Sequence, residues 1–130
     1  MMDQVHNPIR QAGFLRHSEE RMLTMMLNYV GMGLLLVLIA LPLYFQKIPP
    51  NGFYGFRVRK TMANKDIWYA VNKYSSRWLI ASGLVTVLSA LVLYLMPGIS
   101  LDGYAIACLV VFTIVLATGI IISIRYMNSL

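Results

Sequence analysis

Three basic side chains gather in a short segment that stands between long uncharged runs of the chain. Arg57, Arg59 and Lys60 fall within four consecutive positions. Each basic side chain beside an anionic leaflet contributes about 1 kcal/mol of attraction, so the cluster favours binding of a lipid headgroup or another phosphate. The alternative is that these charges only set the orientation of the chain in a membrane, as basic loop residues commonly do.

The residues around this cluster have the spacing of a shaped loop. Asn51-Gly52 is typical of a turn, and Gly55 allows the backbone to approach another surface closely. Tyr54 and Trp68 flank the basic residues, and aromatic side chains of this kind also collect at the level of the headgroups. The loop is therefore the candidate binding site, and an interfacial aromatic belt is the simpler explanation of its rings.

The sequence predicts no catalytic centre, no metal site and no cofactor. The uncharged runs contain no Asp, Glu, Lys, Arg or His, whereas an ionisable group within the membrane is the usual mark of a proton or ion pathway. In the loops, Asp66 and Asp102 are expected on opposite sides of the membrane, where they cannot pair. Cys108 lies inside the third run, and a lone cysteine there is typically a small packing residue.

Three long apolar runs must position this loop. Hydrophobic residues make up 58% of the sequence and charged residues only 12%. Each run is long enough for a helix that crosses the hydrocarbon core, which takes about 20 residues. In lipid the backbone must satisfy its own hydrogen bonds, so the runs predict helices. The expected fold class is an all-α integral membrane protein with three transmembrane helices, at about 22–45, 79–96 and 104–124.

The remaining segments complete the expected organisation. Residues 1–21 form a polar N-terminal tail, either as a short interfacial helix or as a disordered terminus. The three-helix membrane module spans 22–126 and includes a motif loop and short helix at 47–78. Within that segment, Lys65–Arg77 carries apolar residues at helical spacing, and Asn64 is placed to cap this helix. The helix is expected either to lie in the interface or to extend the second span.

Small residues at helical spacing mark the faces on which the spans are expected to pack. Such residues let two backbones approach closely within a membrane. The expected packing positions are Gly31 and Gly33 in the first span, Ser82, Thr86 and Ala90 in the second, and Thr113, Ala117, Gly119 and Ser123 in the third.

The distribution of basic residues predicts the orientation. With three spans, the motif loop and the C-terminal end share one side of the membrane, and that side carries eight of the 11 Lys and Arg residues. The positive-inside rule places this side in the cytoplasm and the N-terminal tail outside. Orientation and contact with anionic headgroups account for the net charge of +6, so no nucleic-acid partner is expected.

The motif loop resembles the signature of the SdpI/YfhL membrane-protein family. The matching residues are Asn51, Tyr54, Gly55, Phe56, Arg57, Thr61, Met62, Asn64, Asp66, Trp68, Asn72, Lys73 and Tyr74. The resemblance covers roughly residues 22–124. Val58-Arg59 replaces the Thr-Pro of the family, and Ser75-Ser76 takes the place of its glycines. The founding member is a longer, six-span immunity protein, and this chain resembles its C-terminal half.

This resemblance implies a non-enzymatic protein of the bacterial inner membrane. The implied function is immunity to a membrane-active peptide toxin, or sensing of the toxin by holding a cytoplasmic regulator at the membrane. Arg57 would contact an anion or partner, while the other residues would shape, cap or anchor the loop. The candidate site residues are Asn51, Tyr54, Gly55, Arg57, Lys60, Thr61, Asn64, Trp68 and Asn72.

Two other functions fit the same chain. An accessory subunit would dock on a larger membrane complex through its small-residue faces. A small transporter or lipid-handling module would form by oligomerisation, with Asn28, Thr86 and Thr118 lining a path. The expected partners are therefore an anionic lipid bilayer together with a peptide toxin, a cytoplasmic regulator, a second copy of the chain or a larger complex.

Overall fold

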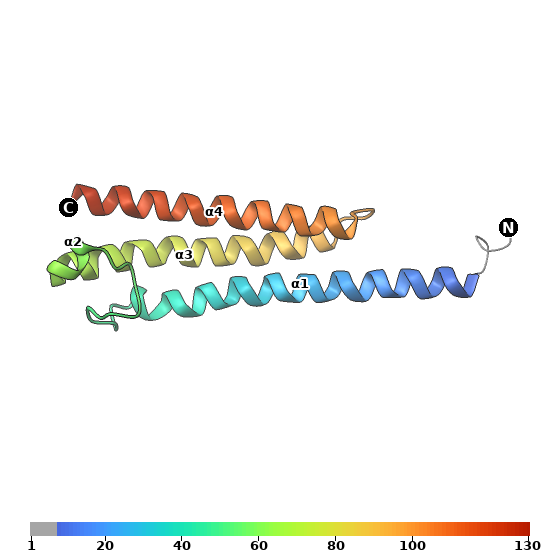
Figure 1. Ribbon diagram of the computed structural model, residues 1–130, viewed down its shortest axis with the longest axis horizontal. Helices are drawn as coiled ribbons and strands as arrows, with labels where there is room; N and C mark the ends of the chain where they lie inside the picture. The colour runs from blue at the N-terminus through green and yellow to red at the C-terminus, as the bar shows by residue number, and fades with distance from the viewer. Residues whose placement is uncertain (1–7) are drawn as a thin grey trace.

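Three long helices lie side by side in the computed structural model, which describes residues 8–130 (Figure 1). In chain order the elements are α1 (Pro8–Tyr44), α2 (Arg59–Ala63), α3 (Lys65–Tyr94) and α4 (Leu101–Ser129). The helices α1, α3 and α4 are each long and apolar enough to cross a membrane. The protein is thus an all-α membrane protein, as its composition predicts.

The first helix is longer than the apolar run that predicts it. We expected a span over 22–45, whereas α1 covers Pro8–Tyr44 and has 37 residues. The described part of the expected polar tail is helical: Pro8 stands at the first position of the helix, where proline is tolerated, and an Arg16–Glu20 ion pair lies at a spacing of one turn. Residues 1–7 of that tail lie outside the described residues. The N-terminal end of α1 projects beyond the other helices (Figure 1).

The helix expected in the motif loop is the first part of the second span. α3 is continuous over Lys65–Tyr94, so the extended form is the correct one of the two alternatives. Asn64 caps it, because the Asn64 side chain accepts hydrogen bonds from the backbone N–H groups of Asp66 (2.8 Å) and Ile67 (3.2 Å). The short helix α2 directly before it was not predicted.

The central helix of the bundle is α3. It packs along both α1 and α4, while α1 and α4 make far fewer contacts with each other. The closest approach of α1 to α3 is at Gly33 and Gly83. A Cβ atom added to Gly33 would lie 2.6 Å from the Gly83 carbonyl oxygen, closer than real Cβ atoms come to another atom. Glycine at both positions therefore allows the two backbones to touch.

The three long helices come together at the α3–α4 turn. The Tyr104 hydroxyl donates a 3.0 Å hydrogen bond to the Ala90 carbonyl, and the Tyr29 hydroxyl donates one of 3.2 Å to the Ala105 carbonyl. The rings of Tyr29 and Tyr104 meet edge to face with centroids 6.4 Å apart. Cys108 is buried in the same cluster. These contacts hold α1 and α4 together at this end of the bundle.

Most of the expected packing positions are buried, and three are not. Ser82, Thr86, Ala90, Gly119, Ser123 and Gly33 are buried between helices. Gly31, Thr113 and Ala117 are exposed, and a Cβ atom on Gly31 would meet nothing within 4 Å. The correction has a simple reason. Small residues occur on several faces of a helix, and the rotation of the helix in the bundle selects the face that is buried.

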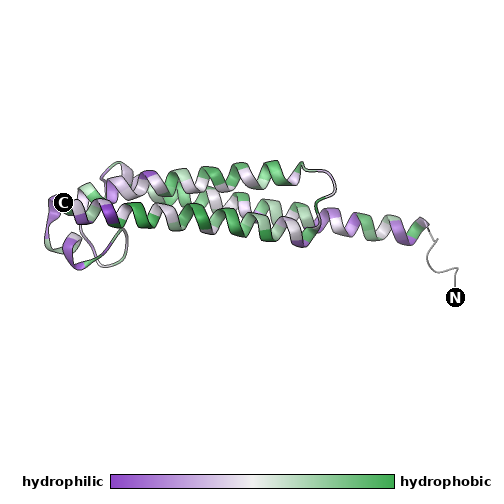
Figure 2. Ribbon diagram, turned by 90° about the horizontal axis from the view of Figure 1, so that it is seen from above, coloured by the Kyte–Doolittle hydropathy of each residue, from purple (hydrophilic) through white to green (hydrophobic). Residues whose placement is uncertain are grey.

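Polar residues are concentrated at the two ends of the structure. Figure 2 shows a hydrophobic middle along α1, α3 and α4, with hydrophilic residues at the loop end and along the first part of α1. The loop end comprises the motif loop, α2, the start of α3 and the end of α4. This arrangement is that of a bundle with lipid as the solvent of its middle.

Candidate functional site

Asn51 organises the first turn of the motif loop. Its side-chain oxygen accepts hydrogen bonds from the backbone N–H groups of Phe53 (2.9 Å) and Tyr54 (2.8 Å). Its side-chain nitrogen donates to the carbonyls of Pro49 (2.8 Å) and Tyr54 (3.1 Å). All the hydrogen bonds of this amide are local. The turn predicted at Asn51-Gly52 is present, and the role of Asn51 in it is to shape the backbone.

Gly55 and Asn72 bring the loop against α3. Gly55 has φ +113°, a conformation that glycine adopts readily and L residues rarely adopt. A Cβ atom at Gly55 would lie 2.7 Å from the Asn72 side-chain oxygen and 3.0 Å from the Trp68 ring. That oxygen accepts a 2.6 Å hydrogen bond from the Phe56 backbone N–H, and the Asn72 nitrogen donates to the Trp68 carbonyl at 2.9 Å. The amide of Asn72 thus joins the loop to the helix.

Trp68 and Thr61 hold the loop at two further points. Both side chains are fully buried. The Trp68 indole N–H donates a 2.9 Å hydrogen bond to the Ile48 carbonyl, which ties α3 to the segment that follows α1. The Thr61 hydroxyl donates to the Phe56 carbonyl at 2.8 Å and accepts from the Val58 N–H at 3.0 Å. The buried Trp68 is therefore part of the core of the loop rather than an interfacial anchor.

Lys60 connects the loop to the end of α4. Its ammonium donates a 3.0 Å hydrogen bond to the Met127 carbonyl in the last turn of α4, where the helix dipole favours a positive charge. The rings of Tyr74 and Tyr126 stack nearby with centroids 4.0 Å apart. Lys60 was expected to bind an anion or partner, and in this structure its partner is a backbone carbonyl.

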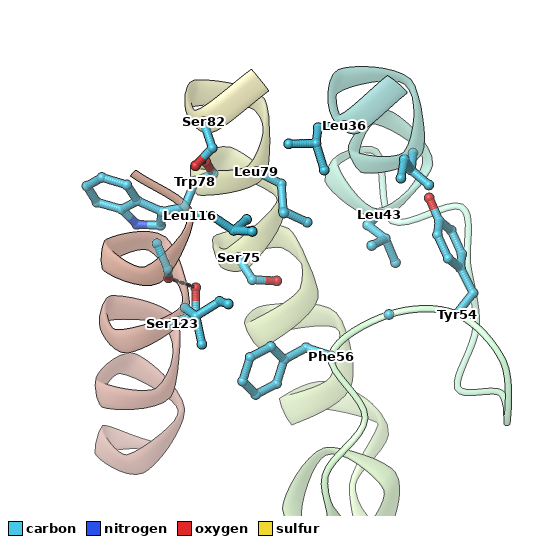
Figure 3. A pocket seen from close by; sticks show the side chains of 14 residues that line it. Leu36, Leu43, Tyr54, Phe56, Ser75, Trp78, Leu79, Ser82, Leu116 and Ser123 are labelled. Atoms are coloured by element: carbon cyan, nitrogen blue, oxygen red, sulfur yellow. Dashed lines mark hydrogen bonds between the residues drawn. The ribbon is translucent and has the colours of Figure 1, made fainter. Parts of the chain in front are cut away.

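An apolar groove lies where α1 and α4 separate. It encloses about 220 Å³ and opens sideways between these two helices. The loop residues Tyr54, Gly55 and Phe56 close one end of the groove. Its walls come from all three long helices: Leu36, Ile39 and Leu43 of α1; Ser75, Trp78, Leu79 and Ser82 of α3; and Leu116, Gly119, Ile120 and Ser123 of α4. Figure 3 shows Phe56 extending from the loop toward α4, while Tyr54 lies beside Leu43.

The few polar groups of the groove are largely satisfied by their own helices. The hydroxyls of Ser75, Ser82 and Ser123 each donate to a carbonyl three or four residues earlier, at 3.2, 2.7 and 2.7 Å. The phenol of Tyr54 is partly buried, and burial raises the pKa of Tyr54, so the phenol is uncharged at neutral pH. The groove consequently presents an apolar, uncharged surface to whatever enters it.

The loop end carries a large excess of positive charge. Its basic residues are Lys47, Arg57, Arg59, Lys60, Lys65, Lys73, Arg77 and Arg125, and they stand against a single acidic side chain, that of Asp66. Within residues 8–130, the ion pairs join Glu20 to Arg16 at 3.3 Å and to His17 at 3.9 Å, at the opposite end of the molecule. Arg57 is exposed and directly follows Phe56 at the closed end of the groove.

The nine predicted site residues fall into two groups. Asn51, Gly55, Thr61, Asn64, Trp68 and Asn72 build the loop and hold it on α3. Tyr54 lines the groove, Arg57 is exposed beside it, and Lys60 bonds to α4. Sequence reasoning missed Phe56 and Trp78 as groove walls. Their aromatic character was visible, but nothing local in the sequence indicates that α1 and α4 separate beside them.

Three membrane-spanning helices and a loop pinned to the middle one define a multi-pass membrane protein with a groove between its spans. The sequence matches the model of the SdpI/YfhL protein family over residues 47–125, more than half of the chain. The chain therefore belongs to the SdpI/YfhL family. The match begins after α1, whereas the resemblance seen in the sequence was taken from residue 22.

A curated relative is similar to less than half of the chain. The uncharacterized protein YfhL of Bacillus subtilis (strain 168) is 37% identical over 60 residues, which are 46% of this chain and 54% of that protein. The chain thus matches about half the length of this relative. No solved structure matches the chain significantly.

Proposed function

We propose that this protein confers resistance to a membrane-active peptide, as a non-enzymatic protein of a bacterial inner membrane with its motif loop in the cytoplasm. One observation carries the proposal, beyond family membership: an apolar groove opens sideways between α1 and α4 and is closed at one end by the motif loop. The signature residues of the loop thereby determine the shape of a surface that a molecule in the bilayer can reach.

The groove suits the side chains of an amphipathic peptide. Such a peptide lies along the membrane, with its apolar face in the acyl region and its polar face among the headgroups. A whole helix is about 10–12 Å wide with its side chains. The groove has a volume of only about 220 Å³, so it cannot hold a segment of such a helix. The peptide would therefore lie across α1 and α4 and insert one or two apolar side chains between them.

The chemistry of the groove favours binding over catalysis. The hydroxyls of Ser75, Ser82 and Ser123 donate to carbonyls of their own helices, and the described residues that line the groove include no base that could activate a nucleophile. In the part of the chain that the structure describes, no three His, Cys, Asp or Glu side chains are grouped so as to hold a metal ion. Sequestration of a peptide needs neither feature.

The proposal is tested by survival of cells that produce the protein. A panel of membrane-permeabilising amphipathic peptides of different net charge serves as the challenge, with an empty vector as reference. We expect the wild type to protect against at least one peptide, and Gly55→Val and Arg57→Ala to lose that protection at equal protein levels. The matched controls are Gly52→Val, where an added Cβ atom meets nothing within 4 Å, and Lys65→Ala, which is exposed at the start of α3.

Each arm of this experiment has its own meaning. A wild type that protects against no peptide refutes resistance as the function. Undiminished protection in both Gly55→Val and Arg57→Ala refutes the motif loop as the site. Equal losses in the two control variants would show that the assay reports general damage to the loop end, which also contradicts the proposed site.

A second candidate function, an accessory subunit, has one observation in its favour. The N-terminal part of α1 projects beyond the bundle and exposes Ile9 (81%), Phe14 (74%) and Leu15 (59%). Co-purification of one stoichiometric partner in mild detergent, lost in Phe14→Ser, would support it. Of the residues proposed to line a transport path between copies of the chain, Asn28 and Thr118 are exposed, whereas Thr86 is buried within one chain.

A further inference from the structure

The position of the groove determines what surrounds it in a membrane. Its walls come from the apolar stretches of α1, α3 and α4, and it is open on one side. In a bilayer this opening faces acyl chains rather than water. If the groove were empty, the atoms that line it would lose their dispersion contacts with partner atoms. An apolar groove open to lipid is therefore filled by an apolar chain that fits it.

The dimensions of the groove select a thin occupant. A space of about 220 Å³ is smaller than the roughly 300–1,000 Å³ of pockets for drug-sized ligands. It excludes a helix, but a single acyl chain is only one methylene wide. The glycine at position 119 keeps the α4 wall free of a side chain beside Trp78, because a Cβ atom there would lie 3.1 Å from the Trp78 Cβ atom.

The charge at the closed end determines which lipid fits. Tyr54, Gly55 and Phe56 form that end, and Arg57 follows at once in the chain. The backbone next to Arg57 is fixed by a 2.6 Å hydrogen bond that the Phe56 N–H donates to the Asn72 side-chain oxygen. Arg57 is exposed and has no carboxylate partner among residues 8–130. Its guanidinium can bind a phosphate with two parallel hydrogen bonds.

We propose that the groove binds one acyl chain of an anionic phospholipid, and that Arg57 contacts the phosphate of this lipid. The apolar walls recognise the chain, and the exposed guanidinium of Arg57, which directly follows the closed end of the groove, selects a net negative headgroup. This inference does not rest on peptide resistance. A peptide that uses the same groove would have to displace the lipid.

A native fluorophore in the groove allows a direct test. The sequence has two tryptophans. Trp78 lines the groove, whereas Trp68 is fully buried and shielded from lipid. The full chain is reconstituted in phosphatidylcholine vesicles without peptide, and phosphatidylglycerol or phosphatidylcholine with brominated acyl chains is added at equal mole fractions. Bromine quenches tryptophan on contact, so the loss of fluorescence reports which lipid occupies the groove.

The expected result is a preference for the anionic lipid that depends on Arg57. Brominated phosphatidylglycerol should bind about fivefold more tightly than brominated phosphatidylcholine, the ratio that corresponds to about 1 kcal/mol for one basic contact. The Arg57→Ala variant should bind the two lipids equally, and the Lys65→Ala variant should still bind phosphatidylglycerol more tightly. Ile120→Phe fills the groove and should reduce quenching by both lipids, while Ile114→Phe, exposed on α4 outside the groove, should leave it unchanged.

Several outcomes would overturn the inference. Equal quenching by the two lipids in the wild type excludes headgroup selection. An equal effect of Arg57→Ala and Lys65→Ala assigns the preference to general surface charge. No quenching of Trp78 by either lipid means that another occupant, such as a second copy of the chain, covers the groove. Native mass spectrometry gives an independent check: one phosphatidylglycerol should remain bound per wild-type chain and be lost in Ile120→Phe.

Discussion

At the scale of single residues, the motif loop is a structural platform more than a row of ligands. Asn72 provides one amide whose oxygen accepts from the loop and whose nitrogen donates to its own helix. Leaving either of these buried groups without a partner costs about 1–3 kcal/mol. Among the predicted site residues, only Arg57 is exposed and makes no side-chain hydrogen bond or ion pair within residues 8–130. Most residues of the family signature thus build the loop, and Arg57 is the signature residue proposed to contact a ligand.

The first prediction concerns Gly55, and Gly52 supplies its control. Gly55→Ala places a Cβ atom against Asn72 and Trp68 at φ +113°, a conformation that costs a residue other than glycine about 1–3 kcal/mol even without a clash. We expect a clear fall in the melting temperature of the protein in detergent. Gly52→Ala meets nothing within 4 Å and should melt like the wild type. Equal melting of both variants would contradict the described loop.

At the scale of elements, three contacts determine how the helices pack. α1 meets α3 at Gly33 and Gly83, and α4 is held at one end by Tyr104 and at the other by Lys60. Between these points α1 and α4 are free to separate, which creates the groove. The groove is therefore a consequence of where the helices are joined, and Gly119 keeps its α4 wall free of a side chain.

The second prediction separates the two glycines of α1. Gly33→Val forces the helices apart, because even a Cβ atom would lie 2.6 Å from the Gly83 carbonyl and 2.8 Å from Val87. Overpacking of this kind costs about 1–3 kcal/mol. Gly31→Val changes an exposed position on the same helix and should be neutral. Both variants are compared by thermal unfolding in detergent, and a more damaging Gly31→Val would refute the described rotation of α1.

The third prediction concerns the contact between the loop and α4. Lys60→Met removes the 3.0 Å hydrogen bond to Met127, and with it a favourable charge at a helix C-terminus worth about 0.3–1 kcal/mol. Hydrogen–deuterium exchange should become faster in the last turn of α4 and stay unchanged around Tyr104. Lys65→Met, which changes an equally exposed lysine, serves as the control. Unchanged exchange at the end of α4 would show that the Tyr74–Tyr126 stack holds it alone.

At the scale of the whole molecule, the charge is strongly asymmetric. The loop end has a large positive excess, while the opposite end balances its arginines with Glu19, Glu20 and Asp102. Such asymmetry orients a membrane protein with its basic end inside. In the proposed orientation, the closed end of the groove would lie at the level of the inner leaflet, where anionic headgroups are available to Arg57.

The fourth prediction tests this orientation by cysteine labelling. Cys108 is the only cysteine of the sequence and is 2% exposed, so the background is low. Phe53 is 97% exposed in the motif loop. Phe53→Cys should react with a membrane-impermeant maleimide only after the cells are permeabilised, whereas Ala12→Cys on α1 should react in intact cells. The reverse pattern would place the loop outside and refute a cytoplasmic site.

Local properties of the sequence were sufficient for several elements. Three uncharged apolar runs predict three membrane helices because the backbone in lipid has no other way to satisfy its hydrogen bonds. Asn64 as a cap and Asn51-Gly52 as a turn depend on contacts within a few residues, and both are present. The membership of the family was likewise visible in the spacing of Gly55, Arg57 and Trp68.

The tertiary structure decided which faces and partners are used. Gly33 rather than Gly31 meets α3, and Phe56 reaches Asn72, 16 residues away, while Lys60 reaches Met127, 67 residues away. Composition and periodicity describe neighbours along one helix. The groove instead arises from the rotation and separation of α1 and α4, which no single helix encodes, because they depend on side chains of all three helices packing at once.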